Sequence, residues 1–215
     1  MPLKSTDRIP AIAMCVVLIL HIVGFFGLQS TQVSQFEALT PLNLLIAFIL
    51  MIPFSQSGKM KLVSFFLFSF TIGMLIEIIG VQTGSPFGTY SYTNILSIAV
   101  FGVPILIGIN WFMLAFGIIS LMNLIYSQGS YLLKVGLSAL IMMSMDVLIE
   151  PFAIKHNLWV WASDIVPLQN YLAWFVISFG IFLIGYKLLA KEKNKVAAFT
   201  ILVFAIFFGL NLLVN

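Results

Sequence analysis

Apolar and polar residues occur along the chain in long separate blocks. Seven stretches consist almost entirely of apolar residues, with short polar segments between them. A membrane-spanning helix needs about 20 apolar residues, so the pattern predicts an all-α, polytopic integral membrane helix bundle with about seven transmembrane helices. The predicted spans are residues 11–28, 42–54, 62–80, 99–126, 131–149, 171–189 and 196–214. Because little chain is left for a soluble domain, we expect residues 1–215 to form a single transmembrane domain.

Two of these runs have an alternative interpretation. The run at 42–54 is short and is framed by Pro41 and Pro53, so a tilted or partial span is the alternative there. The run at 11–28 follows Lys4 and Arg8, as the apolar region of a signal peptide would. It is long for such a region and no small-residue cleavage site follows it. We therefore expect it to be a retained helix.

Composition excludes a soluble enzyme. Apolar residues make up 61% of the chain and charged residues 8%, against about 45–50% and about 25% in soluble domains. The net charge is +3, and the basic residues lie in connecting segments rather than in a patch, so nucleic acid is not expected as a partner. The single cysteine, Cys15, lies inside an apolar run and excludes an internal disulfide.

The basic residues predict the orientation. If the spans alternate in direction, nine of the 10 Lys and Arg residues fall on one side: Lys4, Arg8, Lys59, Lys61, Lys134, Lys187, Lys191, Lys193 and Lys195. Only Lys155 falls on the other. Because basic residues favour the cytoplasmic side, we expect a cytoplasmic N-terminus and a C-terminus outside. Asp7 and Glu192 share the cytoplasmic side, whereas the outer half contains Glu37, Glu77, Asp146, Glu150 and Asp164.

The two longest connecting segments, 81–98 and 150–170, both lie on the predicted outer side. The first contains Tyr90 and Tyr92, and the second contains Trp159 and Trp161. Anchoring at the membrane interface explains single aromatic residues of this kind. Several rings beside acidic residues favour a binding site instead.

A weak internal repeat relates these two regions. Each copy has a Val-Pro pair, an asparagine, and a tryptophan seven residues after the proline. The members are Val103, Pro104, Asn110 and Trp111 in one copy, and Val166, Pro167, Asn170 and Trp174 in the other. Each copy follows an acidic residue at the outer end of the preceding span. Chance could produce the pattern; the alternative is a parallel repeat about an axis along the membrane normal.

Three acidic residues in or directly after predicted spans are candidates for chemistry, because ionisable groups in the membrane are costly. Asp146 and Glu150 are four residues apart and share one helix face. Two such carboxyls do not both ionise easily in apolar surroundings, so one is expected to hold a proton near neutral pH. Glu77 lies near the outer end of its own span. The structural alternatives are a hydrogen bond to a neighbouring helix for Glu77, and a cap or a salt bridge to Lys155 or His156 for the pair.

Pro151 should end the helix at Glu150 and place this carboxyl near the interface. Of the two histidines, His21 is expected to be structural. His156 lies near the acids and could tune their protonation or bind a metal. No metal site is expected, however, because the sequence has no H-x-x-H, no H-x-x-x-H and no cysteine cluster. P-loop, Rossmann and G-x-S-x-G motifs are also absent.

Several motifs together resemble a known family. They are E-x-x-G-x-x-T-G-x-P-F-G-x-Y-x-Y at 77–92, G-V-P-x-x-I-x-x-N-W at 102–111, D-x-x-x-E-P-x-A at 146–153, W-x-W at 159–161 and P-L-x-N-Y-x-x-W at 167–174. This combination, over roughly residues 73–175, is similar to the membrane carotenoid hydratases. These are the CruF-type carotenoid biosynthesis proteins, which include the bisanhydrobacterioruberin hydratases. One departure is that residues 162–166 lack the glycine-containing turn of that family.

The resemblance implies a cofactor-independent hydro-lyase that adds water across the terminal double bond of an acyclic carotenoid end and gives a tertiary alcohol. Asp146, Glu150, Glu77 and Asn110 are the expected catalytic residues. The expected substrate-binding residues are Tyr90, Tyr92, Trp111, His156, Trp159, Trp161, Asn170 and Trp174. The expected partners are a carotenoid dissolved in the bilayer, water, membrane lipid and other carotenoid-pathway enzymes. The expected location is a bacterial or archaeal cytoplasmic membrane.

The chemistry suits the residues found independently. Hydrating an unactivated alkene needs a carboxylic acid as proton donor, aromatic faces that stabilise a carbocation and a group that orients water. Two other classes remain. A carotenoid end-group cyclase or isomerase would share the protonation step but exclude water. A non-enzymatic carrier of small solutes would need a pathway of polar residues through the cytoplasmic half as well, and the sequence lacks such a pathway.

Overall fold

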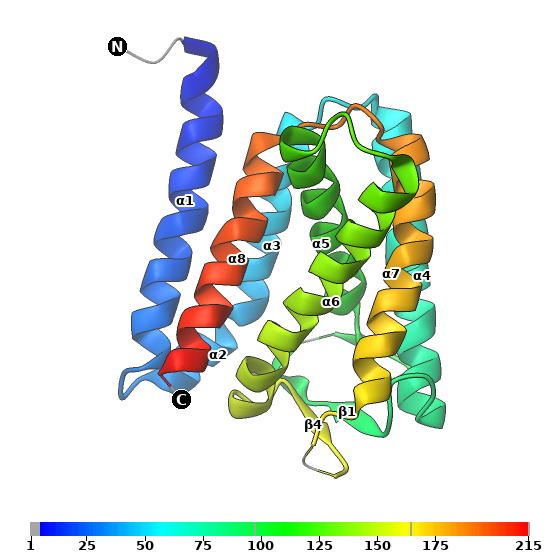
Figure 1. Cartoon of the computed structure of the whole chain (residues 1–215). Coiled ribbons are helices and arrows are strands. Elements are labelled where there is room, and N and C mark those ends of the chain that lie inside the picture. The colour runs from blue at the N-terminus through cyan, green and yellow to red at the C-terminus, as the bar shows by residue number, and fades with distance from the viewer. Residues whose placement is uncertain (1–4, 97, 164, 215) are drawn as a thin grey trace.

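The computed structural model describes residues 5–96, 98–163 and 165–214, and it is a helix bundle with a few short strands (Figure 1). The helices are α1 (Ser5–Leu28), α2 (Val33–Ala38), α3 (Thr40–Met51), the 3-10 turn η1 (Ile52–Phe54), α4 (Lys59–Thr83), the 3-10 turn η2 (Asn94–Leu96), α5 (Ile105–Ile125), α6 (Tyr131–Lys155), α7 (Leu168–Leu188) and α8 (Lys195–Leu213). The strands are β1 (Tyr90–Tyr92), β2 (Ala99–Val100), β3 (Val103–Pro104) and β4 (Trp159–Trp161).

Six of the described helices are long and apolar enough to cross a membrane: α1 from Arg8, and α4 to α8. This confirms an integral membrane helix bundle. The expected second span is the short one, because α3 and η1 together cover only Thr40–Phe54. Helix α3 nevertheless runs alongside α8, in the opposite chain direction (Figure 1). The count of seven full spans therefore stays a prediction.

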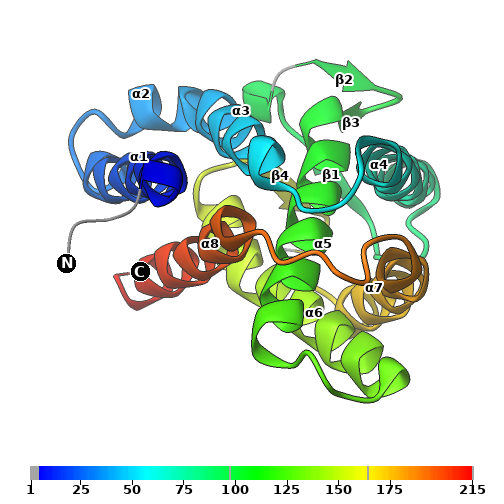
Figure 2. The same cartoon turned by 90° about the horizontal axis from the view of Figure 1, so that it is seen from above.

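Helix α5 forms the centre of the bundle. Its residues 111–119 are buried throughout, and Phe112, Met113 and Phe116 are fully enclosed. Seen along the bundle, α3, α4, α6, α7 and α8 surround α5, whereas α1 lies on the outside beside α8 (Figure 2). A helix that is apolar on all sides is stable in this central position because all its faces meet other helices.

Two predicted helix boundaries are wrong. The helix expected at 99–126 begins only at Ile105, because residues 99–104 form the hairpin of β2 and β3. Phe101 and Gly102 have positive φ angles in its turn, which a helix cannot accommodate. The helix expected to end before Pro151 continues to Lys155. Membrane helices tolerate an internal proline where neighbouring elements enclose it, and here the next two residues, Phe152 and Ala153, are buried.

Two loops are joined across one end of the bundle. Strand β1 follows α4 and strand β4 follows α6, and they pair antiparallel, with Tyr90 opposite Trp161 and Tyr92 opposite Trp159. The short ladder lies at the lower end of the molecule in Figure 1. It fixes four aromatic residues from two distant parts of the chain over the ends of α4 and α6.

The chain begins and ends at opposite ends of the bundle (Figure 1). Eight of the basic residues lie at the end where α1 begins, in or next to the starts of α1, α4, α6 and α8 and the end of α7: Arg8, Lys59, Lys61, Lys134, Lys187, Lys191, Lys193 and Lys195. Lys155 ends α6 at the other end. Lys4 lies outside the described residues. This grouping agrees with the predicted orientation, but the side that faces the cytoplasm stays a prediction.

The end with the basic residues has a buried polar cluster of its own. The carboxylate of Glu192 accepts hydrogen bonds from Ser55 Oγ at 2.6 Å and from the Gln56 and Ser57 amides at 2.9 and 3.0 Å. Asn123 binds backbone carbonyls of the turn between α7 and α8, and Lys134 donates to Asn123. These side chains satisfy loop backbone groups that burial would otherwise leave unpaired.

Candidate functional site

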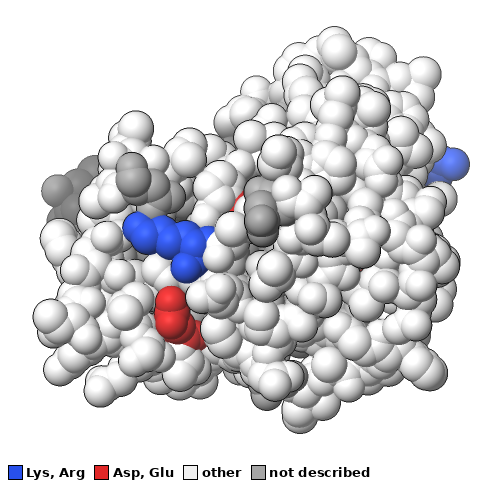
Figure 3. Space-filling model, turned by 90° about the horizontal axis from the view of Figure 1, so that it is seen from below, with Lys and Arg blue, Asp and Glu red and all other residues white. Residues whose placement is uncertain are grey.

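Three carboxyl groups meet in a small cavity at the strand-bearing end of the bundle. Glu77 comes from α4, and Asp146 and Glu150 come from successive turns of α6; all three are at most 3% exposed. Little red is visible among the described residues on the surface seen from this end, and most of it forms one small patch beside a blue one (Figure 3). Glu150 is enclosed by protein, and α6 continues past Pro151 to Lys155.

Glu77 accepts hydrogen bonds at both of its oxygens. The Tyr90 and Tyr92 hydroxyls donate to Oε2 at 2.5 and 2.7 Å, and Trp111 Nε1 donates to Oε1 at 3.1 Å. Burial, and then the neighbouring Glu77 carboxylate, raises the pKa of Tyr90 and of Tyr92 above the ordinary value, so both phenols stay protonated. Three donors around one carboxyl favour its ionised form. The arrangement holds the Glu77 carboxyl in a fixed position.

The two acids on α6 have fewer donors. Trp159 Nε1 and Trp161 Nε1 both donate to Oε2 of Glu150 at 2.9 Å. Asn170 Nδ2 donates to Oδ2 of Asp146 at 2.7 Å. Within the described part of the chain, Oε1 of Glu150 and Oδ1 of Asp146 have no hydrogen-bond partner. Each acid therefore keeps one oxygen available to a molecule in the cavity.

The internal repeat is visible in the geometry. Helices α5 and α7 each begin directly after a Val-Pro pair. Strand β1 directs two aromatic donors at the acid of the helix before it, and β4 does the same for Glu150. The tryptophans of the two copies, Trp111 and Trp174, stack with ring centroids 4.1 Å apart. The two regions thus contribute equivalent halves to one site.

Most of the expected site residues come together. Those that line the cavity with the three acids are Tyr90, Tyr92, Asn110, Trp111, Trp159, Asn170 and Trp174. Trp161 joins through its bond to Glu150 and its contact with the Tyr90 ring. Asn110 lines the cavity without a hydrogen bond to any of the acids among the described residues. It is therefore available to a ligand.

His156 does not join the site. Its Nδ1 lies 2.9 Å from Glu37 Oε1, its ring packs against Phe152, and it is not among the residues that line the cavity. His156 therefore does not form the salt bridge to the acids of α6 that was considered as an alternative. Its acidic partner is Glu37 in α2, which precedes it by 119 residues in the sequence. The sequence offers no signal for this pairing because α2 is a separate short helix.

Sequence reasoning missed three apolar lining residues, Phe87, Ile107 and Ile149. For Ile149 a signal existed, because it follows Asp146 by three positions and shares its helix face. No group of three or more His, Cys, Asp or Glu side chains in the described ranges is arranged to hold a metal ion.

The cavity suits acid–base chemistry on an apolar ligand. Its volume is about 30 Å³, and one water molecule needs roughly 10–15 Å³. Two carboxyl oxygens without partners face it, and indole and phenol rings form much of its wall. Carboxyl groups, room for a water molecule and π faces are thus brought together at one place.

One of the comparisons with known proteins found a match. The sequence model of the carotenoid biosynthesis protein family matches residues 39–215, which include α3 to α8 and every side chain of the cavity. No curated protein and no solved structure matches the chain. Because the match covers most of its length, the chain belongs to the carotenoid biosynthesis protein family.

Proposed function

We propose that the protein is a carotenoid hydratase, which adds water across the terminal double bond of an acyclic carotenoid end and produces a tertiary alcohol. The observation that carries the proposal is the pair on α6. Asp146 and Glu150 are one turn apart, both are buried, and each leaves one oxygen without a partner toward the same ring-lined cavity. Family membership supports carotenoid biosynthesis as the setting.

The hydrogen bonds suggest which acid donates the proton. Glu77 accepts three hydrogen bonds and Glu150 two, whereas Asp146 accepts one, from Asn170. Hydrogen bonds donated to a carboxylate stabilise its charge, so Asp146 is the acid best suited to remain protonated. Glu150, one turn away, is then the carboxylate that orients water.

In the proposed reaction, Asp146 transfers its proton to the less substituted carbon of the double bond. The π electrons form the new C–H bond and leave a tertiary carbocation. A water oxygen attacks this carbon while Glu150 accepts a proton from the water, which gives the tertiary alcohol. Return of that proton from Glu150 to Asp146 restores the starting state, so the net change is the addition of one water.

The rings around the cavity can stabilise the carbocation. Trp159, Tyr92 and Trp174 line it, and cation–π attraction is strongest for tryptophan and in desolvated sites. An ionised Glu77 on α4 would add a favourable field. Water is restricted to the small polar part of the site, which limits side reactions of the cation.

The test is expression in a host that accumulates acyclic carotenoids, followed by mass spectrometry of the pigments. The proposal predicts products heavier by the mass of one water that do not form with Asp146→Asn. Products of unchanged mass with a new ring or a moved double bond would instead identify a cyclase or an isomerase.

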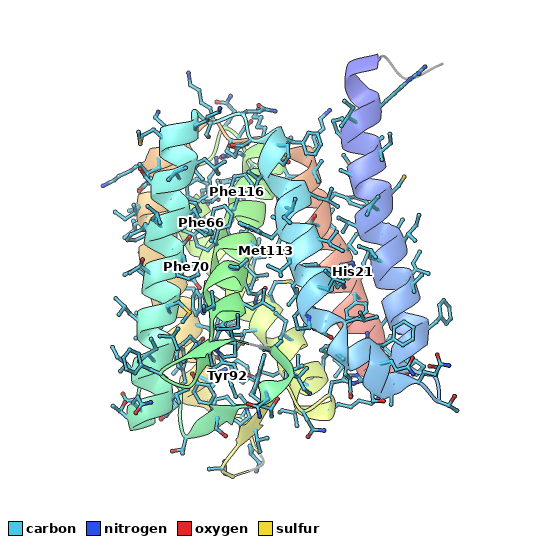
Figure 4. The ribbon with its side chains drawn as sticks, turned by 180° about the vertical axis from the view of Figure 1, so that it is seen from behind. His21, Phe66, Phe70, Tyr92, Met113 and Phe116 are labelled. Carbon is cyan, nitrogen blue, oxygen red and sulfur yellow. The ribbon has the colours of Figure 1, made fainter. Side chains whose placement is uncertain are left out.

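The buried interior of the helix bundle does not support the alternative of a non-enzymatic carrier of small solutes. The carboxyl site and the polar cluster around Asn123 are separated by fully buried apolar residues of α5, among them Phe112 and Met113. In Figure 4, Tyr92 lies near one end, while Phe70, Met113, Phe66 and Phe116 occupy the interior between that level and the opposite end. A hydrophilic solute would find no polar path through this layer.

A further inference from the structure

A second and larger cavity adjoins the carboxyl site. Its volume is about 160 Å³, and residues of α1, α3, α5, α8 and the end of α6 form its walls. Four residues line both cavities: Ile107, Asn110, Ile149 and Trp159. The two cavities therefore adjoin and share part of their lining, and we term the second one the chain cavity.

The chain cavity has the lining of a hydrocarbon-binding site. Five phenylalanines line it, Phe36, Phe152, Phe204, Phe207 and Phe208, together with several leucines. Its few polar members include His21, whose Nδ1 bonds to the Val17 carbonyl of the same helix, and Thr40, whose hydroxyl donates to the Phe36 carbonyl of α2. Another is Asn43, whose buried Oδ1 lacks a partner among the described residues. Apolar walls of this kind favour apolar ligands by removing them from water or lipid.

The chain cavity reaches the outside of the bundle between α1 and the start of α3. Val23 and Leu39 line it and are also 51% and 49% exposed, so they form its rim. Val23 lies five residues before the end of α1, which is about 8 Å along the helix axis. The rim is thus at a depth where a spanning helix meets lipid rather than water.

We propose that the chain cavity binds the polyene chain of the substrate, with the reacting end in the carboxyl site and the remaining chain leaving into the bilayer between Val23 and Leu39. The proposal rests on the proposed function for the identity of the ligand. Its structural basis is independent: an apolar, ring-lined cavity that adjoins the carboxyl site, shares four lining residues with it and has the half-exposed Val23 and Leu39 at its rim.

Helix α1 is the outer wall of this site. It supplies Leu20, His21, Val23, Gly24 and Leu28 to the lining. In Figure 4, His21 lies between α1 and α8, on the inner side of α1. The family match begins only at residue 39, so this chain completes its polyene site with a helix that the match does not include.

The test fills the chain cavity without touching the acids. Leu20→Trp on α1 and Leu44→Trp on α3 replace lining residues. Leu18→Trp and Leu45→Trp are matched controls, because Leu18 and Leu45 lie on the same helices but are 40% and 38% exposed and do not line the cavity. All four are made in an Asp146→Asn background, which separates binding from turnover.

Each protein is purified in detergent from a host that makes acyclic carotenoids, and bound polyene is measured by visible absorbance per protein. We expect the two filling variants to retain about tenfold less polyene than the two controls, which corresponds to ~1.4 kcal/mol of binding. Monodisperse elution and an unchanged thermal transition verify folding. Should one filling variant misfold, the other, and the smaller Leu20→Phe, still decide the question.

Equal polyene in filling and control variants would overturn the inference, whatever the chemistry of the site. If the filling variants lose the polyene but the unmutated acids form no hydrated product, the chain site stands and the proposed reaction fails. The two proposals can therefore fail separately.

Discussion

At the residue scale, the number of donors around each carboxyl sets its role. Asp146→Asn keeps the size and the contact with Asn170 but removes the transferable proton. We expect hydration to fall by about 10²-fold or more, as is typical for general acid–base groups, with little change in thermal stability. The measurement is hydrated product per folded protein.

Glu192→Gln is the matched control, since it also replaces a fully buried carboxyl by its amide but at the opposite end of the bundle. Its carboxylate holds the residues after η1, so it should lower stability and leave turnover per folded protein unchanged. If Asp146→Asn hydrates at a near-normal rate, Asp146 is structural.

Trp159 has two separable functions, because its Nε1 donates to Glu150 and its ring lines both cavities. Trp159→Phe removes the N–H and keeps a π face, whereas Trp159→Leu removes both. If the ring stabilises a cation, Trp159→Leu should turn over about tenfold more slowly than Trp159→Phe, from a cation–π contribution of ~1–2 kcal/mol. Equal rates for the two variants would show that the ring of Trp159 does not stabilise a cation and would leave only its role as a hydrogen-bond donor.

At the scale of elements, the ladder of β1 and β4 aims the aromatic donors at Glu77 and Glu150. Val160 is half-exposed in the middle of β4, opposite Ser91. Val160→Pro should weaken the ladder, because proline lacks the N–H that pairs strands. It should lower turnover by about 10²-fold through misplaced neighbours, although no residue of the cavity changes.

Val160→Ala is its control, since it keeps the backbone N–H and removes only an exposed side chain. We expect it to hydrate normally. Loss of activity in both variants would assign the effect to the Val160 side chain and contradict a positioning role for the ladder.

Hydropathy predicts the helices well because membrane burial acts on whole segments. It fails at Ile105, where a hairpin of apolar residues precedes the helix, and at Pro151, where surrounding elements stabilise a helix that local propensity would end. Pairing of β1 with β4 was not predictable, since it depends on how two helical hairpins come together in space. The i, i+4 spacing of Asp146 and Glu150 did predict their common cavity, because it depends on helix geometry alone.

At the scale of the whole molecule, the basic residues gather at the end opposite the carboxyl site, so the site should face the outside of the membrane. Single cysteines at the exposed Ser85 and Ser163 should react with a membrane-impermeant thiol reagent added to intact cells. Ser127→Cys, between α5 and α6 at the other end, should react only after lysis. The background carries Cys15→Ala, because the native cysteine is exposed.

The reverse labelling pattern would place the carboxyl site on the cytoplasmic side and contradict the orientation, while the cavity itself would be unaffected. Labelling of Ser85→Cys and Ser163→Cys from different sides would contradict the fold, because the segments that contain them are joined by the ladder of β1 and β4.

The sequence predicted only in part which distant residues lie together in the structure. The repeat of Val-Pro, asparagine and tryptophan pointed to equivalent places for Trp111 and Trp174, which stack. The chain cavity carried no signal in the sequence, because its walls are mainly ordinary leucines and phenylalanines from six helices. Only the packing of α1 against α3 and α8 creates that space.

The most direct test of the central claim is the isotopic composition of the product. Purified protein is given an acyclic carotenoid in D₂O and, separately, in ¹⁸O-labelled water, and the product is analysed by mass spectrometry. Proton transfer from Asp146 followed by water addition predicts one carbon-bound deuterium next to the new alcohol and one ¹⁸O in it. Deuterium without ¹⁸O would show that the carbocation forms but is not captured by water, and would contradict hydration.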